Sequence, residues 1–355
     1  MSAPATEAES SKIQAIDLTN PRGDRVSIMS LGGILQSWEV ATGSDGPINI
    51  VLGYHHPHSY LKDTAYHGAI AGRYCNRIAR SRFSIGETSY TLVANEGPHH
   101  LHGGPNGFNQ RIWNIEEQGR QQLKLSLCSE DGDQGYPGNL QVSVSYKLED
   151  DGALAVDWEA TTDADTVVSL TSHGYFNLAG CGDILKHYLR IPAGEYTPVD
   201  GDLIPTGEIC SVASSALDLR KFSRLEDVLA SANPEIQACG GLDHNWAGGS
   251  AGEMLLRAEL FSPHTGLLLS VNSTLPGLQC YTGNHLQGNS IHDCHEGVCL
   301  EPQYYPDSPN HPNFPSPLLR AGETMRHRIS YTVRKVHADL FLSCLDPNTV
   351  RSANL

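Results

Sequence analysis

The sequence of 355 residues has no hydrophobic run that approaches the ~20 apolar residues of a membrane-spanning helix. It also lacks the features of a signal peptide. The first ten residues, MSAPATEAES, contain neither a basic cluster nor an apolar stretch. We therefore expect residues 1–10 to be a disordered lead, and both absences predict a cytoplasmic protein that does not act at a membrane.

Basic residues and paired cysteines are also scarce. The chain has 24 Lys and Arg against 40 Asp and Glu, a formal charge of -16. This balance argues against nucleic acid and anionic membranes as partners, because both bind basic surfaces. The nine cysteines include no CxxC pair, which predicts reduced thiols. Neither a phosphate-binding loop nor a dinucleotide-binding motif occurs, so we expect no cofactor and no metal.

Glycine and proline, by contrast, are abundant, with 35 and 20 residues that mark many turns between short segments. Apolar and polar residues alternate over 140–149 and again over 154–159, which predicts an antiparallel hairpin with one buried face. Similar alternation marks 83–92, 123–127 and 329–333, and two further strands are expected at 254–260 and 266–274. The pattern predicts an all-β protein, a large antiparallel β-sandwich formed as a single domain over 11–345, with a tail at 346–355.

Helices are expected to be few and short. The best candidate follows Ser223, because Glu226 stands three positions later in a capping-box arrangement and Leu225, Val228 and Leu229 supply an apolar stripe. We expect Pro234 to end this helix. A shorter helix is predicted over 59–63.

Several segments carry polar residues that strand packing does not require. They mix Gly or Pro with His, carboxylate, amide and aromatic groups, a composition typical of a concave site that binds a small ligand. These segments are GRYCNRIA (72–79), HHLHGG (99–104), TSHGYFNLAG (171–180), GGLDHNW (240–246), PGLQCYTGN (276–284) and GVCLEPQYYPDSPNHPNFP (297–315).

Single residues in these segments leave alternatives open. Glu301 ends an apolar strand and precedes a Pro-rich loop, which favours a working carboxylate over a buried ion pair. His173 fits either a structural strand position or a site next to Gly174. Asp243 with its neighbours fits a turn as well as a site. His100 and His102 have a spacing that can bind a metal, but no third ligand is close in the sequence.

Taken together and in this order, the six segments resemble the aldose 1-epimerase family, also called galactose mutarotases, from about residue 30 to the end. The resemblance implies a mutarotase-like β-sandwich with a sugar cleft. It also implies an isomerase that interconverts the α and β anomers of free aldoses such as galactose and glucose. By resemblance Glu301 is the general base and His173 the general acid. The implied sugar-binding residues are Asn76, Arg77, His102, Tyr175, Asp243 and Gln279.

The sequence departs from the family pattern at two places. Gly174 stands where serine is usual, and Tyr74-Cys75 replace two small or aliphatic residues before Asn76. Both departures bear on substrate preference more than on reaction type.

The implied reaction suits these residue types. A base takes the proton from the C1 hydroxyl, an acid gives one to the ring oxygen, and closure of the ring reverses both steps. A carboxylate of ordinary pKa, about 4.3, and an imidazole of about 6.5 can fill these roles at neutral pH. Two rival hypotheses remain: a glycoside hydrolase that uses Asp243 and Glu301 as a carboxylate pair, and a sugar-binding protein without turnover. A sugar-phosphate epimerase would need more basic residues at the site.

Overall fold

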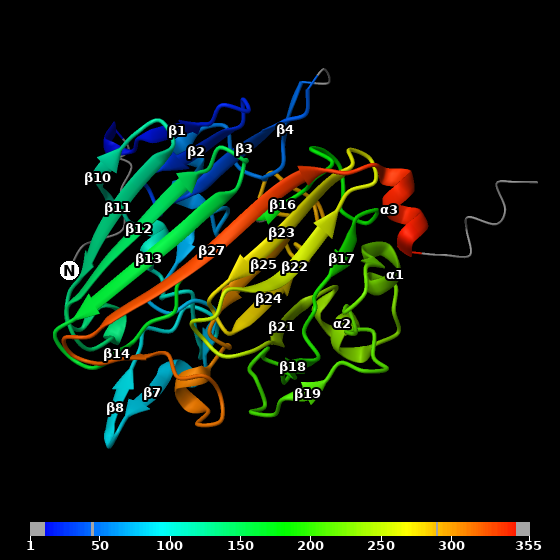
Figure 1. Ribbon diagram of the computed structural model, residues 1–355. Coiled ribbons are helices and arrows are strands. Elements are labelled where there is room, and N and C mark those ends of the chain that lie inside the picture. Colours follow the sequence, from blue (N-terminus) through cyan, green and yellow to red (C-terminus); the bar gives the residue numbers. More distant parts are fainter. Residues whose placement is uncertain (1–10, 44–45, 289, 346–355) are drawn as a thin grey trace, which may run out of the picture.

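The computed structural model describes residues 11–43, 46–288 and 290–345, and most of it is antiparallel β-structure (Figure 1). The expected lead at 1–10 and the expected tail at 346–355 lie outside the described residues. Strands make up 41% of the structure and short helices 11%, so the predicted all-β class is confirmed.

The largest sheet contains nine strands within the described residues, in the order β10-β11-β12-β13-β27-β23-β22-β17-β20 (Figure 1). The predicted hairpins β12–β13 and β22–β23 are confirmed and pair in antiparallel register. The strands are β10 (Asn114–Gln118), β11 (Gln122–Ser129), β12 (Leu140–Leu148), β13 (Leu154–Thr162), β17 (Tyr188–Arg190), β20 (Ser223–Arg224), β22 (Leu255–Phe261), β23 (Leu267–Ser273) and β27 (Thr324–Lys335).

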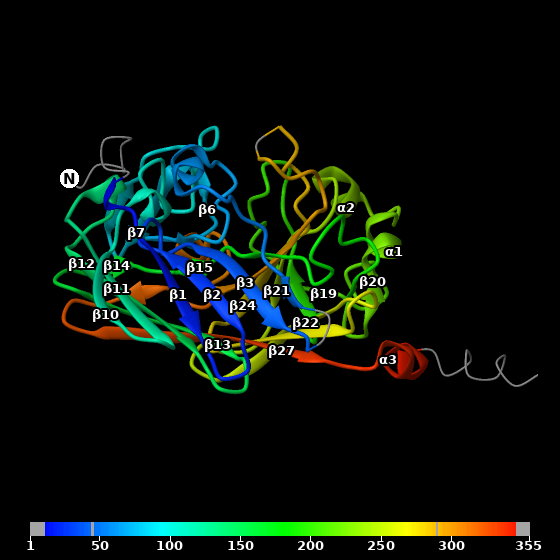
Figure 2. The same cartoon turned by 90° about the horizontal axis from the view of Figure 1, so that it is seen from above.

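A six-stranded sheet packs against the large one, and Figure 2 shows the large sheet along one side with the rest of the molecule above it. Its order is β16-β25-β24-β21-β18-β19, and all its pairings are antiparallel. Its strands are β16 (Tyr175–Phe176), β18 (Glu195–Thr197), β19 (Cys210–Ser211), β21 (Asp243–Ala247), β24 (Gly277–Tyr281) and β25 (Val298–Gln303).

Side chains alternate between the two faces of this second sheet. Leu278, Cys280, Val298 and Leu300 belong to the main hydrophobic core, which also contains residues of the large sheet. Because successive side chains of a strand point to opposite faces, Gln279, Tyr281, Cys299 and Glu301 face away from that core. One face of β24 and β25 therefore packs the core, and the other is available for a site.

Smaller sheets complete the fold. A four-stranded sheet runs β1 (Ala15–Thr19), β2 (Arg25–Met29), β3 (Leu35–Ala41) and β4 (Pro47–Asn49) in chain order. The remaining strands form two-stranded pairs, which are β5 (Ile70–Ala71) with β15 (Thr171–Ser172), β6 (Arg77–Ile78) with β9 (His100–Leu101), β7 (Arg82–Ile85) with β8 (Thr88–Thr91), and β14 (Thr166–Val167) with β26 (Leu318–Leu319). The β6–β9 pair brings the segments of Asn76 and His102 together.

The α-helices of the described residues are α1 (Leu225–Leu229), α2 (Pro234–Cys239) and α3 (Ala338–Leu345), and none is long and apolar enough to cross a membrane. The predicted capping box is wrong, because Ser223 lies in β20 and the N-cap of α1 is Arg224, without a side-chain cap. Pro234 does not end α1 but begins α2, which Asn233 caps. The short 3-10 helices are η2 (Pro57–Lys62), η3 (Ala79–Ser81), η4 (Phe108–Gln110), η5 (Asp133–Gly135) and η6 (Ser308–Asn310).

Candidate active site

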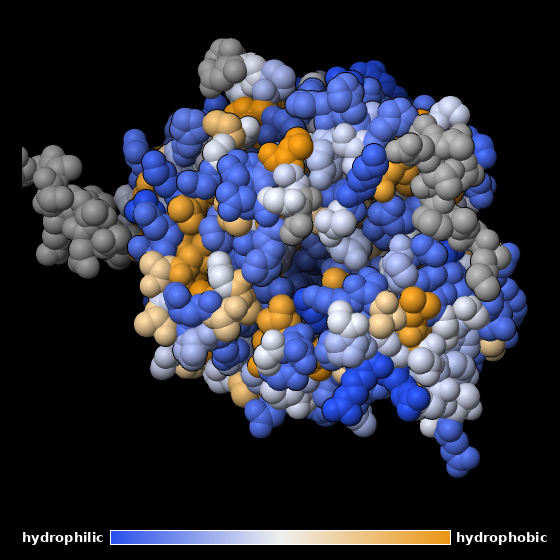
Figure 3. Space-filling model, turned by 180° about the vertical axis from the view of Figure 1, so that it is seen from behind, coloured by the Kyte–Doolittle hydropathy of each residue, from blue (hydrophilic) through white to orange (hydrophobic). Residues whose placement is uncertain are grey.

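All eight residues that the sequence predicts for the site line one pocket of about 260 Å³. Figure 3 shows the molecule from the side opposite to that of Figure 1, and a hollow lies near its centre among hydrophilic residues. The predicted residues in the lining are Asn76, Arg77, His102, His173, Tyr175, Asp243, Gln279 and Glu301. The presence of these residues in one pocket does not test the role of any of them, so the roles stay predictions.

Strand register explains how three of the polar residues meet. Glu301 on β25 lies directly opposite Gln279 on β24, and Asp243 on β21 lies opposite Tyr281 on β24. The turn considered for Asp243 and its neighbours is not formed, since Asp243 is the first residue of β21. These residues share the face that points away from the core, so hydrogen bonding in the sheet fixes their spacing.

His173 and Glu301, the predicted acid and base, lie close together in the pocket. His173 lies between β15 and β16, and its Nε2 is 3.8 Å from Oε1 of Glu301. Both side chains are almost fully buried. Burial, helped by the charge of Asp243, raises the pKa of Glu301 well above its ordinary value. Burial lowers the pKa of His173 to about 4. The ordinary pKa values assumed from the sequence therefore do not hold for these buried side chains.

His102 is oriented by the backbone of Asn76. The N–H of Asn76 donates to His102 Nδ1 at 3.2 Å, and the N–H of His102 donates to the carbonyl of Asn76 at 3.1 Å. Because burial lowers the pKa of His102 well below its ordinary value, the ring is neutral and its proton sits on Nε2. His102 can thus donate a hydrogen bond from Nε2.

The imidazole of His100 contacts different residues from that of His102. Its ring bonds to the carbonyl of Val93 at 2.6 Å and to the hydroxyl of Tyr136 at 2.8 Å. His102 leaves strand β9 with a positive φ of 50°, so the two imidazoles do not share a strand face. His100 and His102, whose spacing in the sequence could suit a metal, therefore do not form a pair of metal ligands.

Arg77 lies between two acidic residues. Its Nη2 is 2.7 Å from Oε1 of Glu96, which has 39% of its side chain exposed. Burial opposes the charge of Arg77, but Asp243 and Glu96 outweigh burial and raise the pKa of the guanidinium. The arginine therefore remains a fixed cation at the wall of the pocket.

Several buried polar atoms of the pocket have no hydrogen-bond partner among the described residues. Gln279 donates from Nε2 to Oδ1 of Asp243 at 2.6 Å, which leaves its own Oε1 without a donor. Oε2 of Glu301 and Nε of Arg77 also lack partners. Since an unsatisfied buried polar group costs about 1–3 kcal/mol, a ligand rich in hydroxyl groups would stabilise this arrangement.

Aromatic rings form the other wall. The hydroxyl of Tyr175 donates to the carbonyl of Ala65 at 2.9 Å, so its ring is held in place beside His173 at a centroid distance of 5.2 Å. The ring of Tyr66 lies 4.6 Å from that of His102 and 5.9 Å from that of His173. These flat surfaces are suited to the apolar face of a sugar ring.

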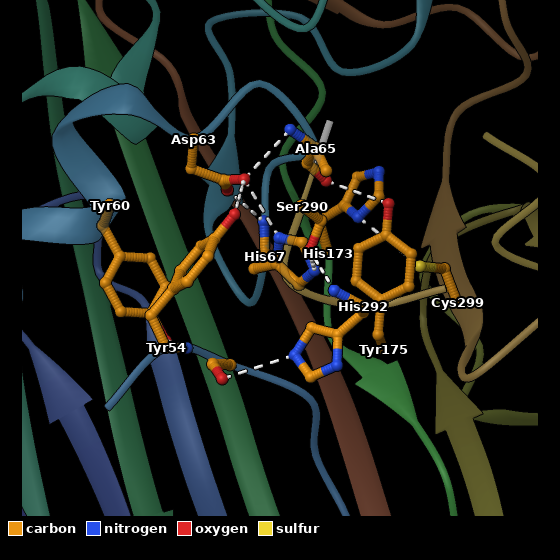
Figure 4. Close-up of polar contacts among 11 residues, drawn as sticks. Tyr54, Tyr60, Asp63, Ala65, His67, His173, Tyr175, Ser290, His292 and Cys299 are labelled. Atoms are coloured by element: carbon orange, nitrogen blue, oxygen red, sulfur yellow. Dashed lines mark hydrogen bonds and ion pairs between the residues drawn. The ribbon is translucent and has the colours of Figure 1, made fainter. Parts of the chain in front are cut away.

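A polar network supports Tyr175 from behind (Figure 4). His67 packs on the Tyr175 ring at 4.8 Å, and its Nδ1 is 3.0 Å from Oδ1 of Asp63. Nε2 of His67 is 3.3 Å from the hydroxyl of Ser290, which belongs to the connection between β24 and β25. The network joins the loop before Tyr66 to that connection.

The two departures from the family pattern have different structural consequences. A Cβ added at Gly174 would meet the Phe176 ring at 3.4 Å, an ordinary contact, so space alone does not require glycine there. Tyr74 is fully buried, and its hydroxyl donates to the carbonyl of Tyr305 at 2.8 Å and accepts from the N–H of Ser308 at 3.2 Å. Tyr74 therefore anchors the Pro-rich segment that follows Glu301.

Sequence reasoning missed several residues that line the pocket, among them Tyr66 and Glu96. Tyr66 has a positive φ of 59° four positions before β5, and its ring lies close to the rings of two predicted site histidines. Glu96 pairs with Arg77 across 19 positions of the chain. The glycines that follow each residue closely, Gly68 and Gly97, were the signal available, because both mark tight turns beside site segments.

Comparison with known proteins gives consistent matches over most of the chain. A family model described as aldose 1-epimerase matches residues 14–332. The galactose mutarotase of Sus scrofa is 39% identical over 313 residues, which cover 85% of this chain and 89% of that protein. The aldose 1-epimerase of Escherichia coli K12 is 38% identical over 330 residues, which cover 90% and 95%.

Solved structures show the same fold. An aldose epimerase homologue from C. elegans superposes with a TM-score of 0.85 at 28% identity, over 91% of this chain and 99% of that one. A galactose 1-epimerase from Lactobacillus acidophilus gives a TM-score of 0.82 at 28% identity, over 92% and 95%. The predicted mutarotase-like β-sandwich is confirmed by these matches.

Proposed function

Because the chain belongs to the aldose 1-epimerase family, we propose that Glu301 is the general base and His173 the general acid of its reaction. The protein is an isomerase, a mutarotase that interconverts the anomers of free aldoses. The observation that carries the assignment of residues is the distance of 3.8 Å between His173 Nε2 and Glu301 Oε1 in one buried pocket. The raised pKa of Glu301 and the lowered pKa of His173 add a proton-transfer step to the proposed reaction.

Burial raises the pKa of Glu301 and lowers that of His173, which favours placing the shared proton on Glu301 before a sugar binds. A sugar hydroxyl that donates to Glu301 favours the carboxylate form, because hydrogen bonds to a charged group lower its pKa. The new carboxylate in turn raises the pKa of the neighbouring imidazole. Sugar binding therefore moves the proton from Glu301 to His173 and creates the active base and acid.

Ring opening then restores the original protonation of Glu301 and His173. Glu301 takes the proton of the C1 hydroxyl, His173 gives its proton to the ring oxygen, and the bond between C1 and that oxygen breaks to leave an aldehyde. Glu301 is then protonated and His173 neutral, which are the forms that burial favours. Rotation about the C1–C2 bond presents the other face of the aldehyde, and closure runs the same transfers in reverse. When the sugar is in its open-chain form, Glu301 and His173 therefore carry the same charges as before the sugar bound.

The remaining residues bind and orient the sugar in this proposal. Arg77, Asn76 and the Nε2–H of His102 supply donors, and Asp243 and Gln279 supply acceptors for hydroxyl groups. Tyr175 offers its ring face. A pocket of about 260 Å³ suits one sugar ring, and the names of the relatives point to galactose, with glucose as the related aldose.

The test is anomer exchange with free sugars. Pure α-galactose is supplied and the relaxation of its optical rotation is followed, with the uncatalysed rate subtracted. We expect Glu301→Gln and His173→Asn each to lower kcat by about 10²–10⁴-fold. Glu259→Gln is the matched control, because Glu259 is also buried but pairs with Arg190 on the large sheet. A Glu301→Gln variant that relaxes the anomers at the wild-type rate would show that Glu301 is not the base.

The two rival functions have distinct outcomes in the same assay. Release of nitrophenol from a nitrophenyl galactoside without faster anomer relaxation would indicate a glycoside hydrolase. Saturable sugar binding without any acceleration would indicate a binding protein. Both results would contradict the proposed roles of Glu301 and His173.

We also propose a cytoplasmic location and one domain over residues 11–345. Eight cysteines of the described residues are unpaired thiols, which supports a reducing compartment. A main core cluster that includes Ile16, Leu300 and Val333 supports a single domain. Cell fractionation tests the location, and a protease-resistant fragment much shorter than this span would argue against one domain.

A further inference from the structure

A buried thiol lies on the other side of the proposed acid. Sγ of Cys299 is 3.5 Å from Nδ1 of His173, while Glu301 is 3.8 Å from Nε2 of the same ring. Cys299 and Glu301 stand two positions apart on β25, so both point to the pocket face. One ligand atom from each of the three side chains lies within 4.8 Å of the other two. Figure 4 includes Cys299 next to Tyr175, close to His173.

Thiolate, imidazole and carboxylate are the three ligand types that zinc binds in proteins. With Zn–S near 2.3 Å and Zn–N near 2.1 Å, a sulfur–nitrogen separation of 3.5 Å corresponds to an S–Zn–N angle of about 105°. That angle is close to tetrahedral, so Cys299 and His173 already have the spacing that zinc requires. The ligand atoms of the three side chains lie within 4.8 Å of one another, so the Glu301 carboxylate has to approach by about 1 Å to take the third position.

The surroundings favour a cation. Oε2 of Glu301 is buried and has no hydrogen-bond partner among the described residues, so a positive charge there would satisfy it. His173 and Glu301 line the pocket, which provides both an entry path and an open fourth position. Three protein ligands with one open position are typical of accessible zinc sites.

We propose that His173, Cys299 and Glu301 form a binding site for a divalent cation of the zinc class, which inhibits the enzyme. The inhibition rests on the proposed function, because the cation occupies the base and the acid. On binding, the Cys299 thiol and the Glu301 carboxyl group each lose a proton to the buffer, and the thiolate and the carboxylate bond to the metal. The cation and the sugar then compete for the same groups, so zinc raises the apparent KM and leaves kcat at saturating sugar unchanged.

The first experiment uses Co²⁺ as a coloured substitute for Zn²⁺ and needs no turnover. A cobalt ion bound to a thiolate has a sulfur-to-metal charge-transfer band in the near ultraviolet. We expect the wild-type protein to show this band, and excess galactose or Zn²⁺ to remove it. Absence of a galactose-sensitive band in the wild-type protein would overturn the proposal without any variant.

The second experiment compares two buried cysteines. Cys299→Ser removes one ligand, whereas Cys280→Ser makes the same change in an equally buried residue of the adjacent strand that faces the core. We expect the band to disappear in Cys299→Ser and to persist in Cys280→Ser. The zinc inhibition constant, measured in each variant against its own metal-free rate, should rise at least about tenfold in Cys299→Ser only.

Other results would separate this site from the proposed chemistry. A band or an inhibition constant that is the same in both variants would overturn the metal site. A band that requires Cys299, together with undiminished turnover when zinc is bound, would keep the metal site and overturn the roles of His173 and Glu301. Thermal melting of both variants confirms that each is folded before the comparison is made.

Discussion

At the scale of single residues, the pocket suppresses charge on its acid and its base at the same time. Burial raises the pKa of Glu301 and lowers that of His173, so the pair shares one proton over a wide range of pH. A base and an acid with ordinary pKa values would hold one proton only between about 4.3 and 6.5. The buried pair therefore extends the working range in both directions.

The first prediction is a broad pH profile. We expect kcat/KM to stay level through pH 6.5 and to fall on the acid side only as the pH nears 4, where a second proton binds His173. The alkaline fall lies above the raised pKa of Glu301, where the last proton is lost. Anomer relaxation measured from pH 4 to 9, corrected for the uncatalysed rate, tests this. A decline centred between pH 6 and 7 would contradict it.

Backbone strain gathers at the pocket as well. Of the ten non-glycine residues with positive φ in the described parts of the chain, four line it: Tyr66, Asn76, His102 and Leu203. Such conformations cost about 1–3 kcal/mol each and persist where the surrounding structure imposes them. In His102 the imposing contacts are its two hydrogen bonds to the backbone of Asn76. The residues that line the pocket are therefore held in position at a local cost in backbone strain.

At the scale of elements, long alternating strands could be predicted and short helices could not. The runs 140–149 and 154–159 match β12 and β13 closely because, in each strand, one face is buried and the other is less buried. The cap of α1 was predicted wrongly because a capping preference of about 1 kcal/mol is weaker than the pairing of Ser223 in β20. The eight site residues were found through motif resemblance, whereas Glu96 had only the adjacent Gly97 as a local signal, and no local pattern specifies its contact with Arg77.

The second prediction is that the hydroxyl of Tyr74 stabilises the fold by anchoring the segment after Glu301. Tyr74→Phe removes a hydroxyl that bonds to the backbone of Tyr305 and of Ser308. We expect the free energy of unfolding to fall by about 1–3 kcal/mol, since two backbone groups lose their partner in a buried place. Urea denaturation measures the change. Tyr90→Phe is the control, because no hydrogen bond of its hydroxyl to the described residues is present and Tyr90 is only partly buried. Equal losses in both variants would refute the anchoring role.

At the scale of the whole molecule, buried neutral histidines make the fold sensitive to acid. Burial lowers the pKa of His100, His173, His187 and His327 to about 4 each. In the unfolded chain these groups bind protons near their ordinary pKa of 6.5. The unfolded state therefore takes up more protons between pH 6.5 and 4, and stability is lost across that window as the pH falls.

The corresponding prediction concerns stability at mild acidity. One such histidine costs up to about 3 kcal/mol by pH 4, a large part of the ~5–15 kcal/mol that stabilises a typical protein. We expect the free energy of unfolding in urea to be nearly constant from pH 8 to 7 and to decrease steadily below 6.5. Measurements at constant ionic strength at pH 7, 6 and 5 test this, and equal values at pH 7 and 5 would disprove it.

The alternation of side chains along β24 and β25 limits where residues can be inserted into the sequence or deleted from it. Removing one residue early in β25 reverses its two faces, which turns Glu301 toward the core and Leu300 toward the sugar, and a deletion early in β24 does the same to Gln279 and Leu278. A substitution has no such effect. We therefore expect insertions and deletions to be accepted in the connections around the pocket and rejected inside these strands. Remodelling of loop length, with β24 and β25 kept intact, is then the practical route to an enzyme that accepts a larger sugar.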